Sequence, residues 1–132
     1  MRVAVIALGL VWFGIYTPVS KAADLCSIVS GSTLIAQDDR NTYLGKITNS
    51  FDSDSIFNEY GNYGNKFSAN SIWNEYSTFG SEYNIASPFN KFSTSPPMII
   101  KNRAVIGYLS SNKALPNSVT PNLLKALCAD AF

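Results

Sequence analysis

Residues 51–60 read FDSDSIFNEY, and the chain returns to FSANSIWNEY at 67–76 and, more loosely, to YNIASPFNKF at 83–92. Serine, an aromatic residue, asparagine and a second aromatic residue recur every sixteen residues, so each copy is expected to repeat one local structure. Repeated units usually bury their apolar residues against neighbouring units. The repeats cover about residues 48–95 and hold no recognisable catalytic constellation, so they predict architecture before activity.

Two similar segments flank the repeats, and each predicts a β-hairpin. Apolar and β-branched runs at 33–37 and 42–47 enclose a polar turn, and runs at 98–100 and 104–109 do the same. If the two hairpins pair, they form a small four-stranded antiparallel sheet, and the repeats become an insert between its halves. The sequence therefore predicts a mainly β (α+β) fold with an irregular repeat insert of short helical turns.

Glycine and serine positions give local expectations. Gly45 and Gly107 lie inside the second strand of each hairpin, where glycine marks a bulge or a close approach by another group. An aromatic ring packed over the glycine is favoured over a binding role. In the repeats, Ser55 and Ser71 are placed to cap short helical turns, because a serine oxygen accepts hydrogen bonds from backbone N–H groups at a helix start.

The C-terminal segment predicts one short helix. Thr120 is a suitable N-cap, and Pro121 suits the first helical position because it needs no N–H donor there. Leu123, Leu124 and Leu127 are spaced to form an apolar face. We expect this leucine face to cover one side of the sheet.

The chain contains two cysteines, Cys26 and Cys128. In an oxidising compartment, the simplest interpretation is one disulfide between the N-terminal segment and the C-terminal helix. An intermolecular bridge or free thiols are the alternatives. A zinc site is not expected, because two cysteines without a histidine supply half of a zinc coordination shell.

Residues 1–22 have the features of an export signal. A positive residue precedes the apolar stretch at 3–15, and a small-residue cleavage site follows at 20–22. The apolar stretch is shorter than the roughly 18 residues that a membrane-spanning helix needs. We therefore expect a cleaved signal peptide and a single exported domain over residues 23–132, located in the periplasm or outside the cell. An uncleaved N-terminal anchor is the alternative.

Charge and side-chain inventory exclude several classes of function. Ten basic and nine acidic residues give a formal net charge of +1, so nothing favours a nucleic acid or an anionic membrane surface as a partner. Because the chain contains no histidine, Ser/His/Asp and Cys/His nucleophilic catalysis are excluded. No cofactor is expected.

Carboxylate pairs remain as candidates for chemistry. Asp38 and Asp39 form one pair, and Asp52 and Asp54 form another. Two carboxylates can run glycoside hydrolysis, but these lie beside Ser and Asn in turns, where aspartate commonly satisfies local backbone groups. Asp52 and Asp54 also resemble the start of a calcium loop. They are a weak metal candidate, because Ile56 occupies the next ligand position.

Aromatic residues are concentrated in the repeats. The eleven are Phe51, Phe57, Tyr60, Tyr63, Phe67, Trp73, Tyr76, Phe79, Tyr83, Phe89 and Phe92. They are expected to fill the core, since aliphatic residues are scarce there and a buried Phe or Trp removes roughly 150 to 250 Å² from water. Tyr60, Tyr63 and Tyr76 are the best candidates for exposure.

A sugar-binding or partner-binding face is the alternative use of the aromatic residues. The candidate ligand-binding residues of such a face are Tyr60, Tyr63, Trp73, Tyr76, Asn58 and Asn74. The regularly spaced asparagines more commonly satisfy the backbone of turns than bind ligands.

Three short segments resemble a group of uncharacterised exported bacterial proteins. They are YLGK at 43–46, YGNYGN at 60–65 and SIWNEY at 71–76. In those proteins, Leu-Gly-Lys hairpins alternate with Tyr-Gly and Ser-Ile-x-Asn repeats. The resemblance covers about residues 33–112. It implies an exported bacterial protein and carries no activity, because that group has no established function.

Taken together, these features favour a non-catalytic exported protein. The first interpretation is a binding or envelope-associated module that contacts a glycan or an envelope protein through the aromatic and asparagine residues of the repeats. A purely structural or accessory cell-surface component is the alternative. A carboxylate-dependent hydrolase is the third candidate. No membrane span is expected after signal cleavage.

Overall fold

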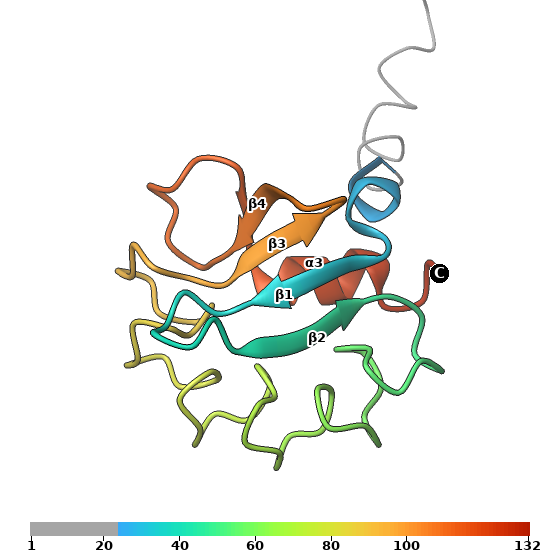
Figure 1. Cartoon of the computed structure of the whole chain (residues 1–132), viewed down its shortest axis with the longest axis horizontal. Coiled ribbons are helices and arrows are strands. Elements are labelled where there is room, and N and C mark those ends of the chain that lie inside the picture. The colour runs from blue at the N-terminus through green and yellow to red at the C-terminus, as the bar shows by residue number, and fades with distance from the viewer. Residues whose placement is uncertain (1–23) are drawn as a thin grey trace, which may run out of the picture.

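A computed structural model describes residues 24–132 of the chain, so the predicted signal peptide at 1–22 lies outside the described residues. A helical segment over 24–29 leads into a five-stranded sheet, and one helix follows near the C-terminus (Figure 1). The elements are β1 (Ser32–Ile35), β2 (Tyr43–Ile47), β3 (Met98–Lys101), β4 (Ala104–Leu109), β5 (Ser118–Val119) and α3 (Pro121–Cys128). In this part of the chain, no helix has the length and apolar character needed to span a bilayer.

The sheet joins the two predicted hairpins. Its strand order is β2-β1-β3-β4-β5. β1 and β3 pair antiparallel, with Leu34 opposite Ile99, so the expected four-stranded antiparallel arrangement is confirmed. β5 adds a fifth strand parallel to β4, which makes the sheet mixed. Between β3 and β4, Asn102 and Arg103 have φ of 53° and 66°. This two-residue turn with positive φ at both positions matches the twist of the strands it joins.

The two strand glycines differ in what approaches them. Gly45 has φ of +102°, and a Cβ at this position would lie 2.6 Å from Cβ of Tyr63. The expected aromatic side chain over a glycine is therefore present here. At Gly107, a Cβ would instead lie 2.7 Å from the carbonyl oxygen of Asn117. The carbonyl oxygen of Asp54 also lies 2.7 Å from a Cβ at Gly45. Both strands thus need glycine for close approach, by a side chain and backbone at Gly45 and by backbone alone at Gly107.

Residues 49–95, named here the turn ribbon, form a continuous series of hydrogen-bonded turns that zigzags from β2 to β3 (Figure 1). Backbone N–H groups donate to carbonyls three residues earlier at positions 52, 55, 58 and 61, at 68, 71, 74 and 77, and at 84, 87, 90 and 93. Four steps of three residues and one of four make up the period from 49 to 65 and again the period from 65 to 81. The insert is therefore regular, whereas an irregular insert was expected.

The first side chain of most turns closes that turn a second time. Asn58 Oδ1 accepts a hydrogen bond from the Tyr60 N–H at 3.0 Å, and Ser71 Oγ accepts one from the Trp73 N–H at 3.1 Å. Asn, Asp and Ser suit this position, because their short side chains reach the backbone two residues further on. Ser55 and Ser71 therefore cap turns as predicted, and these turns follow one another along the ribbon.

The start of the ribbon also covers the outer edge of the sheet. The Lys46 N–H donates to the carbonyl oxygen of Asp54 at 2.8 Å, and the Ile56 N–H donates to the carbonyl oxygen of Lys46 at 2.9 Å. β2 is the edge strand on this side. These bonds occupy backbone groups of β2 that would otherwise be open to another chain.

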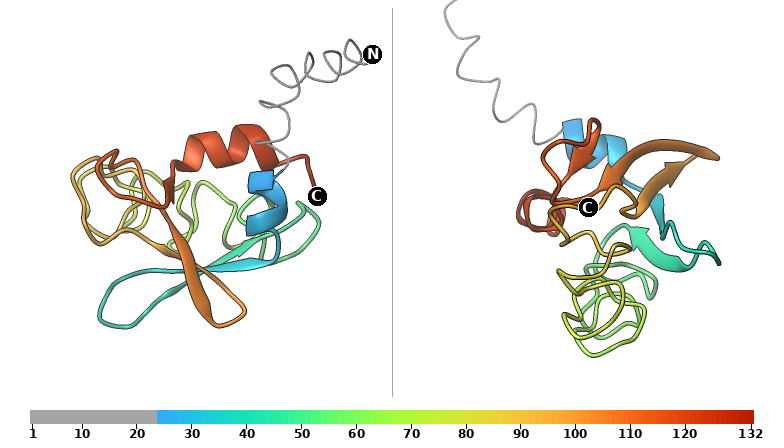
Figure 2. Two further views of the ribbon diagram at one scale, coloured as in Figure 1. Left: turned by 90° about the horizontal axis from the view of Figure 1, so that it is seen from above. Right: turned by 90° about the vertical axis from the view of Figure 1, so that its left-hand side faces the viewer.

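The core lies between the sheet, α3 and the inner bends of the ribbon (Figure 2). Buried positions recur every eight residues, at Ile56, Gly64, Ile72, Gly80 and Pro88 in the ribbon and at Pro96 directly after it. Of the eleven aromatic residues in the repeats, Phe57 and Phe79 are buried. The prediction that these aromatic side chains fill the core is therefore wrong for most of them, because Ile, Pro and Gly occupy the bends that face the sheet.

Helix α3 has the predicted start but buries a different face. Thr120 Oγ1 accepts a hydrogen bond from the Leu123 N–H at 3.1 Å. The buried residues of the helix are Pro121, Leu124 and Cys128. Leu123 and Leu127 are exposed, so the predicted leucine face is wrong. The bridge at Cys128 holds that side of the helix against the core, and this turns Leu123 away from it.

The predicted disulfide between Cys26 and Cys128 is present, with the two Cα atoms 5.4 Å apart and 102 residues apart in sequence. It joins the helical segment over 24–29 to the end of α3. A disulfide of this kind indicates an oxidising, non-cytoplasmic location. Lys101 Nζ donates to the carbonyl oxygens of Ser27 and Ile28 at 3.3 and 2.9 Å, which caps the C-terminal end of the first helical segment.

Candidate functional site

The outer bends of the turn ribbon carry exposed aromatic side chains in a regular order. They are Phe51, Tyr60, Phe67, Tyr76, Tyr83 and Phe92, and their exposed fractions run from 85% to 97%. Phe51, Phe67 and Tyr83 occupy one position of the sixteen-residue period, and the other three occupy a second position. The ribbon therefore presents two sets of three aromatic rings to solvent.

The geometry of the turns fixes these rings outward. Each exposed aromatic residue is the third residue of a turn whose first residue is Asn or Ser, and its own N–H donates to that side chain. The turns that begin at Ser55, Ser71 and Ser87 have Ile or Pro in second place and point inward. Their aromatic residues, Phe57, Trp73 and Phe89, are buried or half-buried.

The candidate asparagines serve the ribbon itself. The Nδ2 of Asn58 donates to the carbonyl oxygen of Asp52 at 3.2 Å, and that of Asn74 donates to the carbonyl oxygen of Ser68 at 3.0 Å. Their Oδ1 atoms accept the turn hydrogen bonds to Tyr60 and Tyr76. Both amides are thus engaged by the backbone, as the sequence analysis favoured, and they position the neighbouring tyrosines.

Tyr63 lies apart from the exposed rings. It is half-buried against Gly45, and its ring meets that of Tyr43 edge to face at a centroid distance of 5.1 Å. The Tyr43 hydroxyl donates to Asp54 Oδ2 at 2.7 Å. Burial, followed by this hydrogen bond to Asp54, raises the pKa of Tyr43 well above its usual value of 10.0. Tyr63 therefore supports the sheet edge, whereas exposure was expected.

Trp73 is half-buried and held from three sides. Its indole Nε1–H donates to the carbonyl oxygen of Ile56 at 2.6 Å. Lys125 Nζ lies 4.6 Å from the centroid of the indole, and the Phe89 ring lies 6.0 Å away in an edge-to-face arrangement. A cation over an indole face is an attractive contact. Trp73 is therefore fixed in orientation by groups from the first copy, the third copy and α3.

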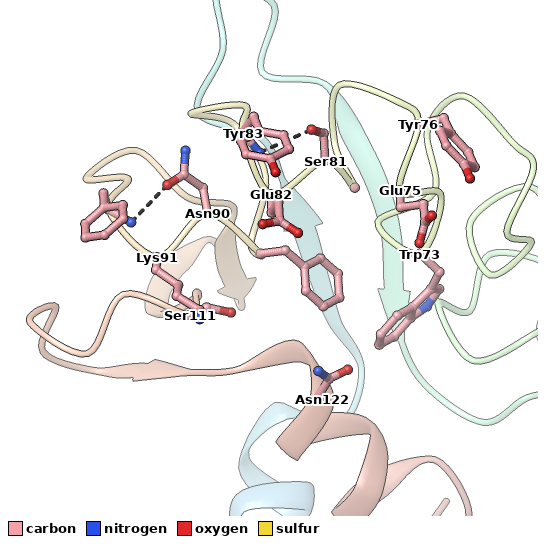
Figure 3. Close-up of a pocket in the computed structure, with 13 residues that line it drawn as sticks. Trp73, Glu75, Tyr76, Ser81, Glu82, Tyr83, Asn90, Lys91, Ser111 and Asn122 are labelled. Atoms are coloured by element: carbon pink, nitrogen blue, oxygen red, sulfur yellow. Dashed lines mark hydrogen bonds between the residues drawn. The ribbon is translucent and has the colours of Figure 1, made fainter.

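Trp73 and Phe89 belong to an open groove between the second and third copies of the repeat (Figure 3). The residues that line it are Trp73, Glu75, Tyr76, Gly80, Ser81, Glu82, Tyr83, Phe89, Asn90, Lys91, Phe92, Ser111 and Asn122. The groove combines five aromatic rings with carboxylate, ammonium, hydroxyl and amide groups. Of the candidate residues from the sequence, it brings together Trp73 and Tyr76 and leaves Tyr60 and Tyr63 outside.

Sequence reasoning missed most of the polar lining of this groove. Glu75, Glu82 and Lys91 are the middle residues of outward turns, and a charged residue in that place was an available signal. Ser111 and Asn122 come from the chain after β4 and from α3. Nothing in the repeat pattern places these two beside the ribbon, because long-range packing sets their position.

Three of the four paired carboxylates, those of Asp38, Asp52 and Asp54, are engaged locally. Asp38 accepts hydrogen bonds from the N–H and the hydroxyl of Thr42 at 2.9 and 2.6 Å, and the hydroxyl contact is the main cause of a lowered pKa at Asp38. Asp52 Oδ1 accepts from the Asp54 N–H at 2.9 Å. Among residues 24–132, no cluster of three or more Asp, Glu, Cys or His side chains is placed to hold a metal ion.

The described part of the chain is thus a small protein with a mixed sheet, two short helices, one disulfide and an exposed series of aromatic rings. Comparison with protein-family models, curated proteins and solved structures finds no match.

Proposed function

We propose that this chain is an exported, non-catalytic binding module that contacts a glycan or a protein of the bacterial cell envelope through the outer bends of the turn ribbon. One observation carries the proposal: six aromatic side chains stand exposed at regular intervals, although the ribbon could be closed without them. The turns are closed by Asn and Ser side chains and by backbone groups. The exposed rings therefore contribute little to the folded state.

Exposed aromatic rings are available to stabilise a complex. Covering one such side chain contributes about 1.5–3 kcal/mol of favourable free energy. Each ring sits on a turn that is already closed, so little ordering entropy remains to oppose binding. Several rings at a fixed spacing also suit a ligand with a repeating structure, because each repeat of the ligand can meet an equivalent ring.

Local hydrogen bonds of the carboxylates support the non-catalytic part of the proposal. Asp38, Asp52 and Asp54 accept hydrogen bonds from nearby backbone or hydroxyl groups. Export is supported by the disulfide, which needs an oxidising compartment, and by the signal-like residues 1–22.

A pull-down tests the proposal. The protein is purified after secretion, and its retention on isolated peptidoglycan, on envelope polysaccharide and on immobilised envelope proteins is measured. We expect retention on one of these materials, and a loss of at least about tenfold in the double variant Tyr60→Ser/Tyr76→Ser, because two exposed rings are removed. The matched control is Val105→Ser, which removes an exposed apolar side chain from β4.

Both variants must retain the wild-type midpoint of urea unfolding, since all three side chains are exposed. Equal retention of the double variant and the wild type on every material would overturn the proposed function. Trp73 is unsuitable for this test, because its indole bonds to Ile56 and packs against the core.

A further inference from the structure

We infer that the groove between the second and third repeats holds a sugar ring of a neutral polysaccharide. This inference rests on the function proposed above and names its ligand class and its site. The groove is lined by Trp73, Tyr83 and Phe89 among other rings, and by Glu75, Glu82 and Lys91 among polar groups (Figure 3). Its charged groups come from two copies of the repeat, and Ser111 and Asn122 come from outside the repeats.

The aromatic residues of the groove suit the apolar face of a sugar. A pyranose ring presents several C–H groups on one face, and these pack against the electron-rich face of an aromatic ring. Trp73 and Phe89 are half-buried and form a fixed pair at 6.0 Å, whereas Tyr76, Tyr83 and Phe92 are exposed around them. The pair therefore offers a preformed surface, and the exposed rings can extend the contact to neighbouring sugar units.

The indole of Trp73 has no polar requirement left to satisfy. Its N–H already donates to the carbonyl oxygen of Ile56. The ring can thus be covered by a ligand without burying an unpaired donor, which would cost about 1–3 kcal/mol. Lys125 Nζ and the Phe89 ring cover part of the indole, so the part of the ring that they leave open is the hydrocarbon surface that remains for a sugar.

Polar groups around the rings are arranged to meet hydroxyl groups. Between the residues that line the groove, hydrogen bonds join Ser81 to Tyr83 and Asn90 to Phe92 (Figure 3). No hydrogen bond joins Glu75, Glu82 and Asn122 of this groove to one another, so their polar groups are available to a ligand. A carboxylate accepts and an amide both donates and accepts, while a sugar hydroxyl can do either. Vicinal hydroxyls can thus satisfy these groups together.

The balance of charge separates a neutral glycan from other ligands. Two carboxylates and one ammonium line the groove, and the Lys125 ammonium lies 4.6 Å from the centroid of the Trp73 indole. These charges balance, so an anionic polymer would lose hydration without a net attraction. A lipid chain or another purely apolar occupant would desolvate Glu75 and Glu82 without giving them partners, which is unfavourable. A neutral polyhydroxylated chain avoids both penalties.

Fluorescence of Trp73 gives a direct test. The chain contains two tryptophans, Trp12 and Trp73, and Trp12 lies in the predicted signal peptide. In the secreted protein, with cleavage verified by intact mass, emission then reports on the groove alone. The probes are cellohexaose, maltohexaose and the hexamer of N-acetylglucosamine, with the hexamer of galacturonic acid as the charged comparison. We expect at least one neutral probe to shift the emission in a saturable manner.

The repeat supplies matched variants. Tyr83 lines the groove and Phe51 occupies the same position of the first copy, outside it. Likewise, Glu75 lines the groove and Glu59 is its counterpart in the first copy. We expect Tyr83→Ala and Glu75→Gln to raise the Kd at least about tenfold. Phe51→Ala and Glu59→Gln should leave the Kd within about twofold of the wild type.

Several results would overturn the inference. One is the absence of any shift with all three neutral probes up to about 10 mM, where even millimolar affinity is detectable. Others are preferential binding of the galacturonic acid hexamer, or an equal effect of Phe51→Ala and Tyr83→Ala. A concentration-dependent dimer that Tyr83→Ala abolishes would make a second copy the occupant. In each case the proposed function survives if the Tyr60/Tyr76 variant still loses retention, so the two failures can be distinguished.

Discussion

Replacing Gly80 with alanine should destabilise the protein strongly, because the inner bend leaves no room for a methyl group. A Cβ at Gly80 would lie 2.0 Å from the carbonyl oxygen of Asn74 and 2.9 Å from that of Ile72. Real Cβ contacts are essentially never shorter than 3.0 Å. The backbone on one side must therefore move by about 1 Å, and overpacking of this kind lowers the free energy of unfolding by about 1–3 kcal/mol.

The required movement also strains two hydrogen bonds. The N–H groups of Gly80 and Ser81 both donate to the carbonyl oxygen of Ser77, at 3.3 and 3.0 Å. Each such bond contributes about 1 kcal/mol. The expected loss in the free energy of unfolding is therefore about 3–5 kcal/mol, which is a large share of the stability of a small domain.

The control is the same substitution at an open site. Gly31 has φ of +82°, and no atom lies within 4 Å of a Cβ placed there. Gly31→Ala therefore carries only the left-handed backbone penalty of about 1–2 kcal/mol. Urea denaturation of the wild type and both variants measures the difference. If Gly80→Ala costs no more than Gly31→Ala, the close packing of the inner bends is refuted.

Three further predictions follow from the described contacts. Removing the disulfide with Cys26→Ala/Cys128→Ala should lower the free energy of unfolding by about 4–5 kcal/mol, since the loop it closes is about 100 residues long. Urea unfolding curves of the wild-type protein that coincide with and without reductant would contradict this. Asn74→Ala should cost about 1–2 kcal/mol in the same assay, because it deletes the hydrogen bond to the Ser68 carbonyl oxygen and the one from the Tyr76 N–H. The raised pKa of Tyr43 means that the folded state keeps the phenol proton after the unfolded state has lost it, so stability should fall as the pH rises above 10.0. Urea unfolding at pH 9 and pH 11, about one unit on either side of the usual tyrosine pKa, measures this loss of stability. Tyr43→Phe should make the loss smaller, and an equal loss in the variant and the wild type would refute the assignment to Tyr43.

The sheet was predictable where its signal is local. Each hairpin has apolar runs on both sides of a short turn, and the pairing of β1 with β3 follows from placing the two hairpins side by side. β5 was not predicted. It has two residues, Ser118 and Val119, and it pairs with β4 through backbone groups, so alternation in the sequence does not mark it.

The turn ribbon was recognised as a repeat, but its orientation was misjudged. The sixteen-residue period conceals a shorter one, since Asn, Asp or Ser recurs every three residues at 49, 52, 55 and 58. The middle residue of each turn carries the orientation signal: Ile56 and Ile72 mark inward turns, whereas Glu59 and Glu75 mark outward ones. The aromatic residues carry no such signal, because an aromatic residue follows the middle residue in inward and in outward turns alike.

The groove was beyond prediction for a different reason. Trp73 and Tyr76 were proposed from the repeat, and both line it. Its remaining wall depends on Asn122 in α3, and the rotation of that helix is set by the bridge at Cys128, which closes a separation of 102 residues. No local pattern encodes a contact of that range.

The way in which the ribbon hydrogen-bonds has a consequence for its behaviour in crowded surroundings. In a regular turn, two of the three backbone N–H groups donate within the turn, one to a carbonyl and one to a side chain, as at Tyr60 and Gly61. A sequence rich in Asn, Ser, Gly and aromatic residues would otherwise be prone to stack into cross-β fibrils, which grow through unpaired strand edges. Because two of every three donors are already used, the ribbon can expose its aromatic rings at high protein concentration while offering few backbone groups to a growing fibril.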